Sequence, residues 1–150
     1  WYKRCAEGYR QSMLHAGLEP KISEIHSDDH QLGYLAMRSI LSRHEPVTAV
    51  FAGSDQIARG VYEAIRQSGL AIPSDISVAG FNDSEGALMD PPLTSVREFP
   101  EELGRHLAEF VLRRLRQPDR ESQALVIPTR VILRASTSAL PALMTAKGPS

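Results

Sequence analysis

The chain has 150 residues, 42% of them hydrophobic, which is enough to bury one substantial core but not two complete domains. Its 17 lysines and arginines nearly balance its 18 aspartates and glutamates, so charge gives no reason for direct binding to nucleic acid, a membrane or an acidic substrate. The single cysteine excludes an intramolecular disulfide and fits a reducing compartment. No apolar run approaches the ~20 residues that cross a bilayer.

Helices and strands are predicted to alternate in the first half of the chain. Apolar residues recur at helical spacing in three segments, and three other segments read as strands because they are short and mostly apolar. Alternation with short connections is typical of an α/β fold with a doubly wound parallel sheet. The predicted elements in chain order are helices over residues 2–16, 29–42 and 55–67 and strands over residues 22–26, 48–52 and 76–81.

The pattern changes after Pro91 and Pro92. A short extended piece is followed by one helix, in which Pro100 suits the first turn, and then by two more extended runs. The tail from Ala139 is rich in alanine, proline and small residues, so we expect it to be poorly ordered. The predicted elements of this half are extended runs over residues 93–96, 125–127 and 131–133 and a helix over residues 100–115.

Polar residues follow two neighbouring strands of the predicted sheet. Ser54 and Asp55 come after one strand, and Asn82 and Asp83 come after the next. In open parallel sheets, ligands bind outside the carboxyl ends of the strands, so these residues are candidates for a binding site. The same residue types also cap helices and form turns without any ligand. Both interpretations stay open, because a capping residue can still face a ligand.

Other chemistries find little support in the sequence. His26 and His30 flank Asp28 and Asp29, but a polar strand-to-helix loop explains this cluster without a metal. Cys5 has no identifiable partner base, and the chain contains no phosphate-binding glycine loop, no G-x-S-x-G elbow and no H-E-x-x-H motif. We therefore expect no metal, no cofactor and no enzymatic activity.

Several segments in a distinctive order resemble one known family. They are P-V-T-A-V-F-A-G-S-D-Q-I-A-R-G at 46–60, G-L-A-I-P-S-D-I-S-V-A-G-F-N-D at 69–83, P-P-L-T-S-V at 91–96 and R-V-I-L-R-A-S-T at 130–137. Together with E-G-Y at 7–9, they make residues 3–138 resemble the lactose/galactose-repressor family of transcription regulators. Such regulators carry an N-terminal helix-turn-helix domain and a two-lobed effector-binding core like that of periplasmic sugar-binding proteins, and they bind operators as dimers. The resemblance implies the second lobe of that periplasmic-binding-protein-like core, here incomplete.

The resemblance assigns effector-binding positions at the strand ends. Ser54 stands where the family usually has asparagine, next to the matching Asp55. Asn82 stands where the family usually has aspartate, which in sugar-responsive members accepts hydrogen bonds from hydroxyl groups.

Three further positions depart from the family pattern. Asp28 falls where an aromatic residue often stacks on the ligand, and Glu98 falls where glutamine is common. Cys5 falls where an arginine is frequent, although Arg4 is adjacent and could substitute for it. These changes make the site more acidic. Because unpaired buried like charges are costly, we expect a hydroxyl-rich or cationic effector rather than an acidic or phosphorylated one.

The resemblance also implies a division between lobes. Residues 1–97 and 128–138 would belong to the C-terminal lobe, residues 98–127 to the N-terminal lobe, and residues 139–150 to a disordered tail. The helix at 100–115 would then lack the sheet that covers its apolar stripe, so we expect it to be loosely held, to fold back onto the lobe or to pack on a neighbouring chain. Because the sequence starts without methionine and within a predicted helix, we expect a natural segment before Trp1.

These observations favour one function over two alternatives. We expect the ligand-binding and dimerisation portion of a cytoplasmic repressor that senses a sugar or a related polyol or nucleoside. Operator DNA would be bound by an absent N-terminal domain, and residues 55–67 and 88–96 match the family's homodimer contact. The first alternative is a periplasmic sugar-binding protein of a transport system, and the second is a doubly wound enzyme. Residues upstream of Trp1 would discriminate between the repressor and the periplasmic protein, since they would form a helix-turn-helix in the first case and a signal peptide in the second.

Overall fold

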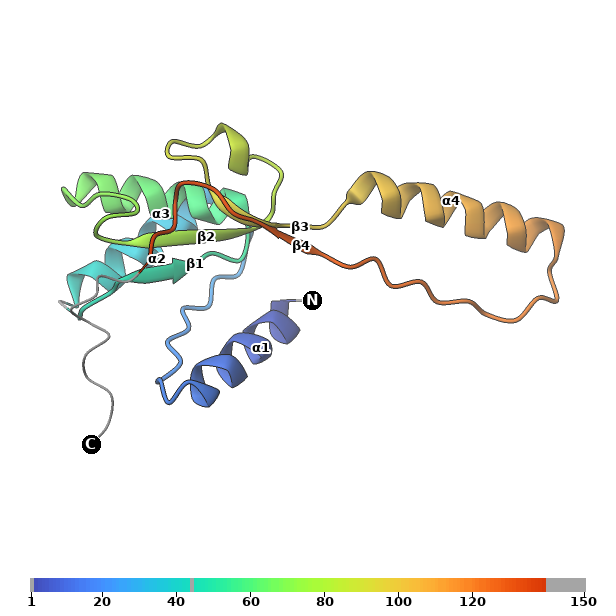
Figure 1. The fold of residues 1–150 in the computed structure, drawn as a ribbon, viewed down its shortest axis with the longest axis horizontal. Helices are drawn as coiled ribbons and strands as arrows, with labels where there is room; N and C mark the ends of the chain where they lie inside the picture. The colour runs from blue at the N-terminus through green and yellow to red at the C-terminus, as the bar shows by residue number, and fades with distance from the viewer. Residues whose placement is uncertain (1, 44, 140–150) are drawn as a thin grey trace.

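A computed structural model describes residues 2–43 and 45–139. Figure 1 shows a body that contains a sheet and two packed helices, and an arm that extends from it and carries a long helix. The elements in chain order are α1 (Tyr2–His15), α2 (His30–Ser42), β1 (Ala49–Phe51), α3 (Asp55–Gln67), β2 (Ser77–Asn82), the 3-10 helix η1 (Gly86–Leu88), β3 (Thr94–Arg97), α4 (Pro100–Arg116) and β4 (Arg130–Ile132).

The sheet has four strands in the order β1-β2-β3-β4. β1 pairs with β2, and β2 with β3, in parallel, whereas β4 runs antiparallel to β3 because the chain comes back from α4 toward the sheet. Past β4, Ser136 bonds with both the backbone N–H and the carbonyl of Val78 on β2. The predicted α/β fold with a parallel sheet is confirmed, with an antiparallel strand added at its edge.

The core lies between the sheet and the pair α2–α3. α3 is strongly amphipathic, and Ala58, Val61 and Ile65 on one face of it are buried. Two glycines allow α2 and α3 to approach closely, since a Cβ on Gly33 would lie 2.4 Å from the carbonyl oxygen of Ile57. The fully buried apolar residues of the core are Met37, Ala58, Ala64, Ile65, Val78 and Leu93.

The strand predicted over residues 22–26 does not form. The segment is an irregular connection, and Ile22 is exposed. In a doubly wound sheet with strand order 2-1-3-4-5, the second strand pairs only with the first, and no strand precedes α1 among the described residues. The segment therefore has no strand to pair with. Figure 1 shows α1 lying apart from the sheet, and residues 3–15 have no buried side chain.

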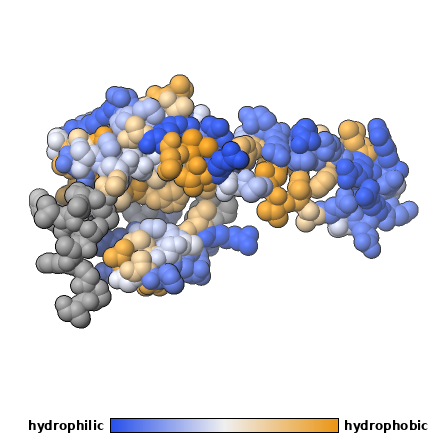
Figure 2. Space-filling view, in the orientation of Figure 1, coloured by the Kyte–Doolittle hydropathy of each residue, from blue (hydrophilic) through white to orange (hydrophobic). Residues whose placement is uncertain are grey.

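The arm consists of α4 and the extended segments on either side of it. Glu101 and Glu102 in the first turn and three arginines in the last turn favour the helix through its dipole. Nevertheless α4 has no buried residue, and its apolar stripe is open, with Leu107 56% and Leu115 72% exposed. Figure 2 shows apolar residues exposed along this arm, which has not folded back onto the body. The extended run predicted over residues 125–127 forms no strand.

The predicted tail at 139–150 lies outside the described residues, apart from residue 139. Within the described part of the chain, no helix has the length and the apolar character needed to cross a membrane.

Candidate functional site

The ends of β1 and β2 bring Ser54 and Asn82 to the same edge of the sheet. Phe51 is in register with Ala79 in the parallel pair. Ser54 comes three residues after Phe51, and Asn82 comes three residues after Ala79. Ser54 is the N-cap of α3, and its Oγ accepts a hydrogen bond of 3.1 Å from the backbone N–H of Ile57. The helix cap and the strand end therefore share one location.

Asp28 joins this edge from the loop before α2. The Oγ of Ser54 donates a hydrogen bond to Oδ1 of Asp28, although 26 residues separate the two in sequence. Ser54 is only 3% exposed, whereas Asp28 is exposed. The carboxylate thus lies at the surface beside the positive end of the α3 dipole. This hydrogen bond between two candidate site residues was not predicted.

Asp55 is held by hydrogen bonds from within the protein. Its Oδ2 accepts hydrogen bonds from the backbone N–H groups of Glu85 at 3.0 Å and Gly86 at 2.8 Å, and its Oδ1 accepts one of 2.7 Å from Ser95 Oγ. The residue has no exposed surface. This buried carboxylate ties the start of α3 to η1 and β3 and so positions the edge, and whether it also contacts an effector stays a prediction.

Asn82 ends β2 in a left-handed backbone conformation, with φ of 80°. Its Oδ1 accepts hydrogen bonds from the backbone N–H of Ser84 at 3.3 Å and from its hydroxyl at 3.0 Å. The residue is partly exposed, so its amide lies where a small molecule can reach it. Asparagine tolerates this conformation better than most residues do.

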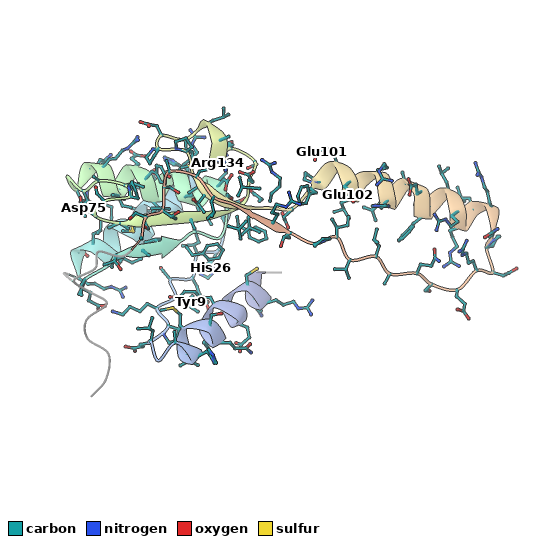
Figure 3. The ribbon with its side chains drawn as sticks, viewed as in Figure 1. Tyr9, His26, Asp75, Glu101, Glu102 and Arg134 are labelled. Carbon is teal, nitrogen blue, oxygen red and sulfur yellow. The ribbon has the colours of Figure 1, made fainter. Side chains whose placement is uncertain are left out.

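An ion cluster behind Asn82 was not predicted. Asp83 accepts hydrogen bonds from Arg97 Nε at 2.7 Å and from Arg134, whose Nη1 and Nη2 lie 2.6 and 3.0 Å from its two carboxylate oxygens. Figure 3 labels Arg134 against the body of the protein, far from Glu101 and Glu102 on the arm. The position of Asp83 after a predicted strand could be read from the sequence, but its two arginine partners could not. They lie 14 and 51 residues away, so no local sequence pattern indicates them.

The cluster is electrically compensated. Burial alone would raise the pKa of Asp83, but hydrogen bonds from Arg134 and Arg97 outweigh this effect and lower the pKa below its ordinary value. Hydrogen bonding to Asp83 raises the pKa of Arg134, and the charge of Asp55 adds to this effect. Asp83 is therefore paired with both guanidinium groups at the edge.

Of the remaining predicted site residues, Glu98 follows the end of β3 beside this edge, whereas Arg4 and Cys5 are on α1. Glu98 is exposed at the base of the arm, just after β3. Arg4 is exposed and Cys5 partly exposed on α1, which Figure 1 shows apart from the sheet. The ion pair on α1 is local, between Arg10 and Glu7. Whether Arg4, Cys5 and Glu98 contact an effector stays a prediction.

The strand edge itself is open. Two hollows, of about 100 and 340 Å³, lie along the arm and are lined mainly by residues of α4 and the segment after it. A small molecule at the edge would thus need cover from elsewhere. Within residues 2–43 and 45–139, no three His, Cys, Asp or Glu side chains gather in a way that could hold a metal ion.

An α/β fold with polar residues at the carboxyl ends of its parallel strands defines a class of small-molecule-binding proteins. The chain belongs to the family described as the periplasmic binding protein-like domain, whose model matches residues 1–137. It is 38% identical over 133 residues to the ribose operon repressor of Escherichia coli (strain K12), a match that covers 87% of this chain and 40% of the repressor.

Comparison with solved structures also identifies transcription regulators. A complex of the transcriptional regulator CelR with cellobiose aligns with a TM-score of 0.79 and 34% identity, covering 87% of this chain and 41% of that one. The lac repressor dimer bound to operator and the anti-inducer ONPF aligns with a TM-score of 0.80 and 25% identity, covering 89% and 46%. The resemblance to lactose/galactose-type repressors is confirmed, and these relatives are transcription regulators, not enzymes. The chain spans about 40% of the length of the ribose operon repressor.

Proposed function

We propose that this chain is the effector-binding and dimerisation part of a transcription repressor that senses a sugar-like molecule. The observation that carries the proposal is the polar edge formed by Ser54, Asp28 and Asn82 at the carboxyl ends of β1 and β2. It is supported by relatives named as the ribose operon repressor and as CelR in complex with cellobiose. A regulator of DNA binding works where the chromosome is, so we place the protein in the cytoplasm.

The chemistry of the edge favours a neutral, hydroxyl-rich effector, with a cationic one as the alternative. Asp28 already brings a negative charge to the N-terminus of α3, the place where a phosphate or carboxylate would otherwise bind. Asp83 accepts hydrogen bonds from both Arg97 and Arg134, so the charge of these two guanidinium groups is partly neutralised within the protein. The oxygens of Asp28 and Asn82 can accept hydrogen bonds from hydroxyl groups.

A second lobe would complete the site. In this proposal residues 1–97 and 128–138 form one lobe and residues 98–127 belong to the other. The open strand edge and the exposed stripe that includes Leu107 on α4 support this division, since each lacks cover. Closure of two lobes around an effector moves the hinge between them only if the closed state binds the effector more tightly. Glu98, at the base of the arm, lies where the lobes would meet.

A dimer and a helix-turn-helix domain would complete the regulator. The lac repressor structure, a dimer bound to operator, supports this assembly. Leu88 of η1, 87% exposed, lies in the segment 88–96 that we propose for the homodimer contact together with α3. Sedimentation at a series of concentrations should show a dimer that Leu88→Glu weakens. An unchanged association constant would contradict this contact.

Binding without chemistry is part of the proposal. The carboxylates of Asp55 and Asp83 are held by donors within the protein, so neither is poised as a base or nucleophile. The alternative, a periplasmic sugar-binding protein, would have the same fold. The relatives named above, however, are transcription regulators.

The decisive experiment measures DNA binding by the complete protein. Selection from a random-sequence duplex library should enrich a palindromic site, and D-ribose, cellobiose or another neutral sugar should change the affinity for it by about fivefold or more. Absence of any enriched sequence, together with sugar binding, would favour the transport alternative.

A further inference from the structure

The arm joins the body where β3 and β4 pair. β3 runs into the arm after Arg97, and the chain returns through Arg130 of β4, which pairs directly with Arg97. Residues 98–129 between them contribute no fully buried side chain to the body. The arm is therefore connected to the strand edge through two segments, which we call the legs: the end of β3 and the segment that begins at β4.

Asp83 is bonded to both legs. On the outgoing leg, Arg97 places Nε 2.7 Å and Nη2 2.6 Å from Oδ2 of Asp83. On the returning leg, Arg134 forms a two-pronged contact with both carboxylate oxygens, and its Nη1 also donates to the carbonyl of Leu93 at 2.6 Å. The Asp83 side chain has no exposed surface. A buried bidentate pair is directional, so it fixes geometry as well as charge.

Asp83 is also continuous with the candidate effector site. Asn82 and Asp83 both have positive φ, 80° and 55°, a conformation that non-glycine residues seldom adopt unless the surroundings hold them there. The holding contacts are the two arginines and a hydrogen bond of 3.2 Å from the backbone N–H of Asp83 to Ser95 Oγ. Asn82 is itself in register with Arg97. The backbone that presents Asn82 is thus held by the same residue that holds the legs.

We propose that Asp83 is a positioning residue that locks the Asn82 turn to both legs of the arm, so that occupancy of the strand edge is transmitted to residues 98–129. The transmission to the arm rests on the function proposed above, whereas the lock itself does not. Asp83 acts through Arg97 and Arg134 and does not touch the effector.

Hydrogen exchange of the unliganded complete protein tests the lock. Asp83→Asn keeps a residue suited to positive φ but removes the charge that holds both arginines. We expect amides of residues 97–99 and 130–134 to exchange about tenfold faster or more, in both legs together. The matched control is Glu85→Gln on the same loop, where the side chain bonds Gln56 and Arg59 and reaches neither leg. It should leave both legs within twofold of the wild type. Faster exchange near residue 82 alone, with both legs unchanged, would overturn the proposal.

A second comparison separates positioning from simple stability. In the wild type, saturating cellobiose or D-ribose should slow exchange at residues 82–86 and also in the two legs. In Asp83→Asn the sugar should still protect 82–86 but no longer the legs, a pattern that uniform destabilisation does not produce. If Asp83→Asn does not fold, Arg97→Lys, which alters the outgoing leg alone, should lose protection in that leg only. If no sugar changes exchange in the wild type, the proposed function fails, while the unliganded comparison still decides the lock.

Discussion

Gly60 of α3 lies directly against the backbone of His30 at the start of α2. A Cβ at position 60 would lie 2.0 Å from the carbonyl oxygen of His30 and 2.4 Å from the backbone nitrogen of Tyr34. Both neighbours are backbone atoms, so no side chain can swing away to make room. The close approach matters for the candidate site because α2 and α3 begin at the same edge, next to Asp28 and Ser54.

We therefore expect Gly60→Ala to force the two helices apart and to lower the free energy of unfolding by about 2 to 3 kcal/mol. Gly104→Ala is the matched control, because a Cβ there meets nothing within 4 Å on exposed α4. Alanine should favour that helix by roughly 0.5 to 1 kcal/mol. Urea unfolding of both variants measures the difference. A Gly60→Ala protein as stable as the wild type would contradict the close packing.

Asp55 gives a second prediction about stability. Replacement by alanine leaves three buried donors without an acceptor: the N–H groups of Glu85 and Gly86 and the hydroxyl of Ser95. Each buried group left unpaired costs about 1 to 3 kcal/mol, so Asp55→Ala should lose about 3 kcal/mol or more. Ser95→Ala removes one of these bonds and also the acceptor of the Asp83 N–H, so it should cost about 2 kcal/mol. Equal losses in the two variants, measured by chemical unfolding, would show that the carboxylate does not organise this loop.

Acid sensitivity should come in part from Asp83. Its pKa is lowered in the folded protein from an ordinary value of 3.8, because Arg134 and Arg97 favour the charged form despite burial. A lowered pKa stabilises the fold at pH above the ordinary value, and this contribution disappears as the pH falls through the lower, folded-state pKa. The stability difference between the wild type and Asp83→Asn should thus be large at neutral pH and should shrink under acid.

Unfolding measured from neutral pH down to about pH 2 tests this dependence. The control is Glu109→Gln, since the pKa of Glu109 is also lowered, chiefly by its hydrogen bond with Arg105, but that carboxylate is exposed on the arm. Solvent screens such a pair, so the control should follow the wild-type pH profile closely. A pH profile for Asp83→Asn that parallels the wild type throughout would argue against the cluster.

The sequence predicted the helices well because their signals are local. The stripe of Ile57, Val61 and Ile65 placed a helix over residues 55–67, and the structure has α3 at the same bounds. The three parallel strands were each placed within one residue or so, since their apolar runs end at polar residues that the helix starts and turns require.

Long-range partners set the limit of that prediction. The segment 22–26 has a strand-like pattern but no neighbouring strand in the described structure, and a local pattern cannot show this. The hydrogen bond from Ser54 to Asp28 joins residues 26 positions apart and was not predicted. The capture of Asp83 by Arg134 joins residues 51 positions apart and depends on β4 running antiparallel, which no short motif encodes.

Asn82 carries the prediction about binding. Asn82→Gly keeps the positive φ without strain and removes only the side chain, so the fold should be retained. If the amide contacts the effector, the affinity for a neutral sugar should fall by about tenfold to a hundredfold, the loss expected for one or two hydrogen bonds. Thermal unfolding without sugar checks that the variant is intact. An unchanged dissociation constant in a folded Asn82→Gly protein would remove Asn82 from the site.

Calorimetric titration of the complete protein with neutral sugars and their phosphorylated counterparts tests the central claim most directly. The compensated charges of Asp83 and Arg134, and the carboxylate of Asp28 at the start of α3, predict saturable binding of a neutral sugar at least tenfold tighter than that of its phosphate ester. Tightest binding by a sugar phosphate or a sugar acid, or no binding by any sugar, would contradict it.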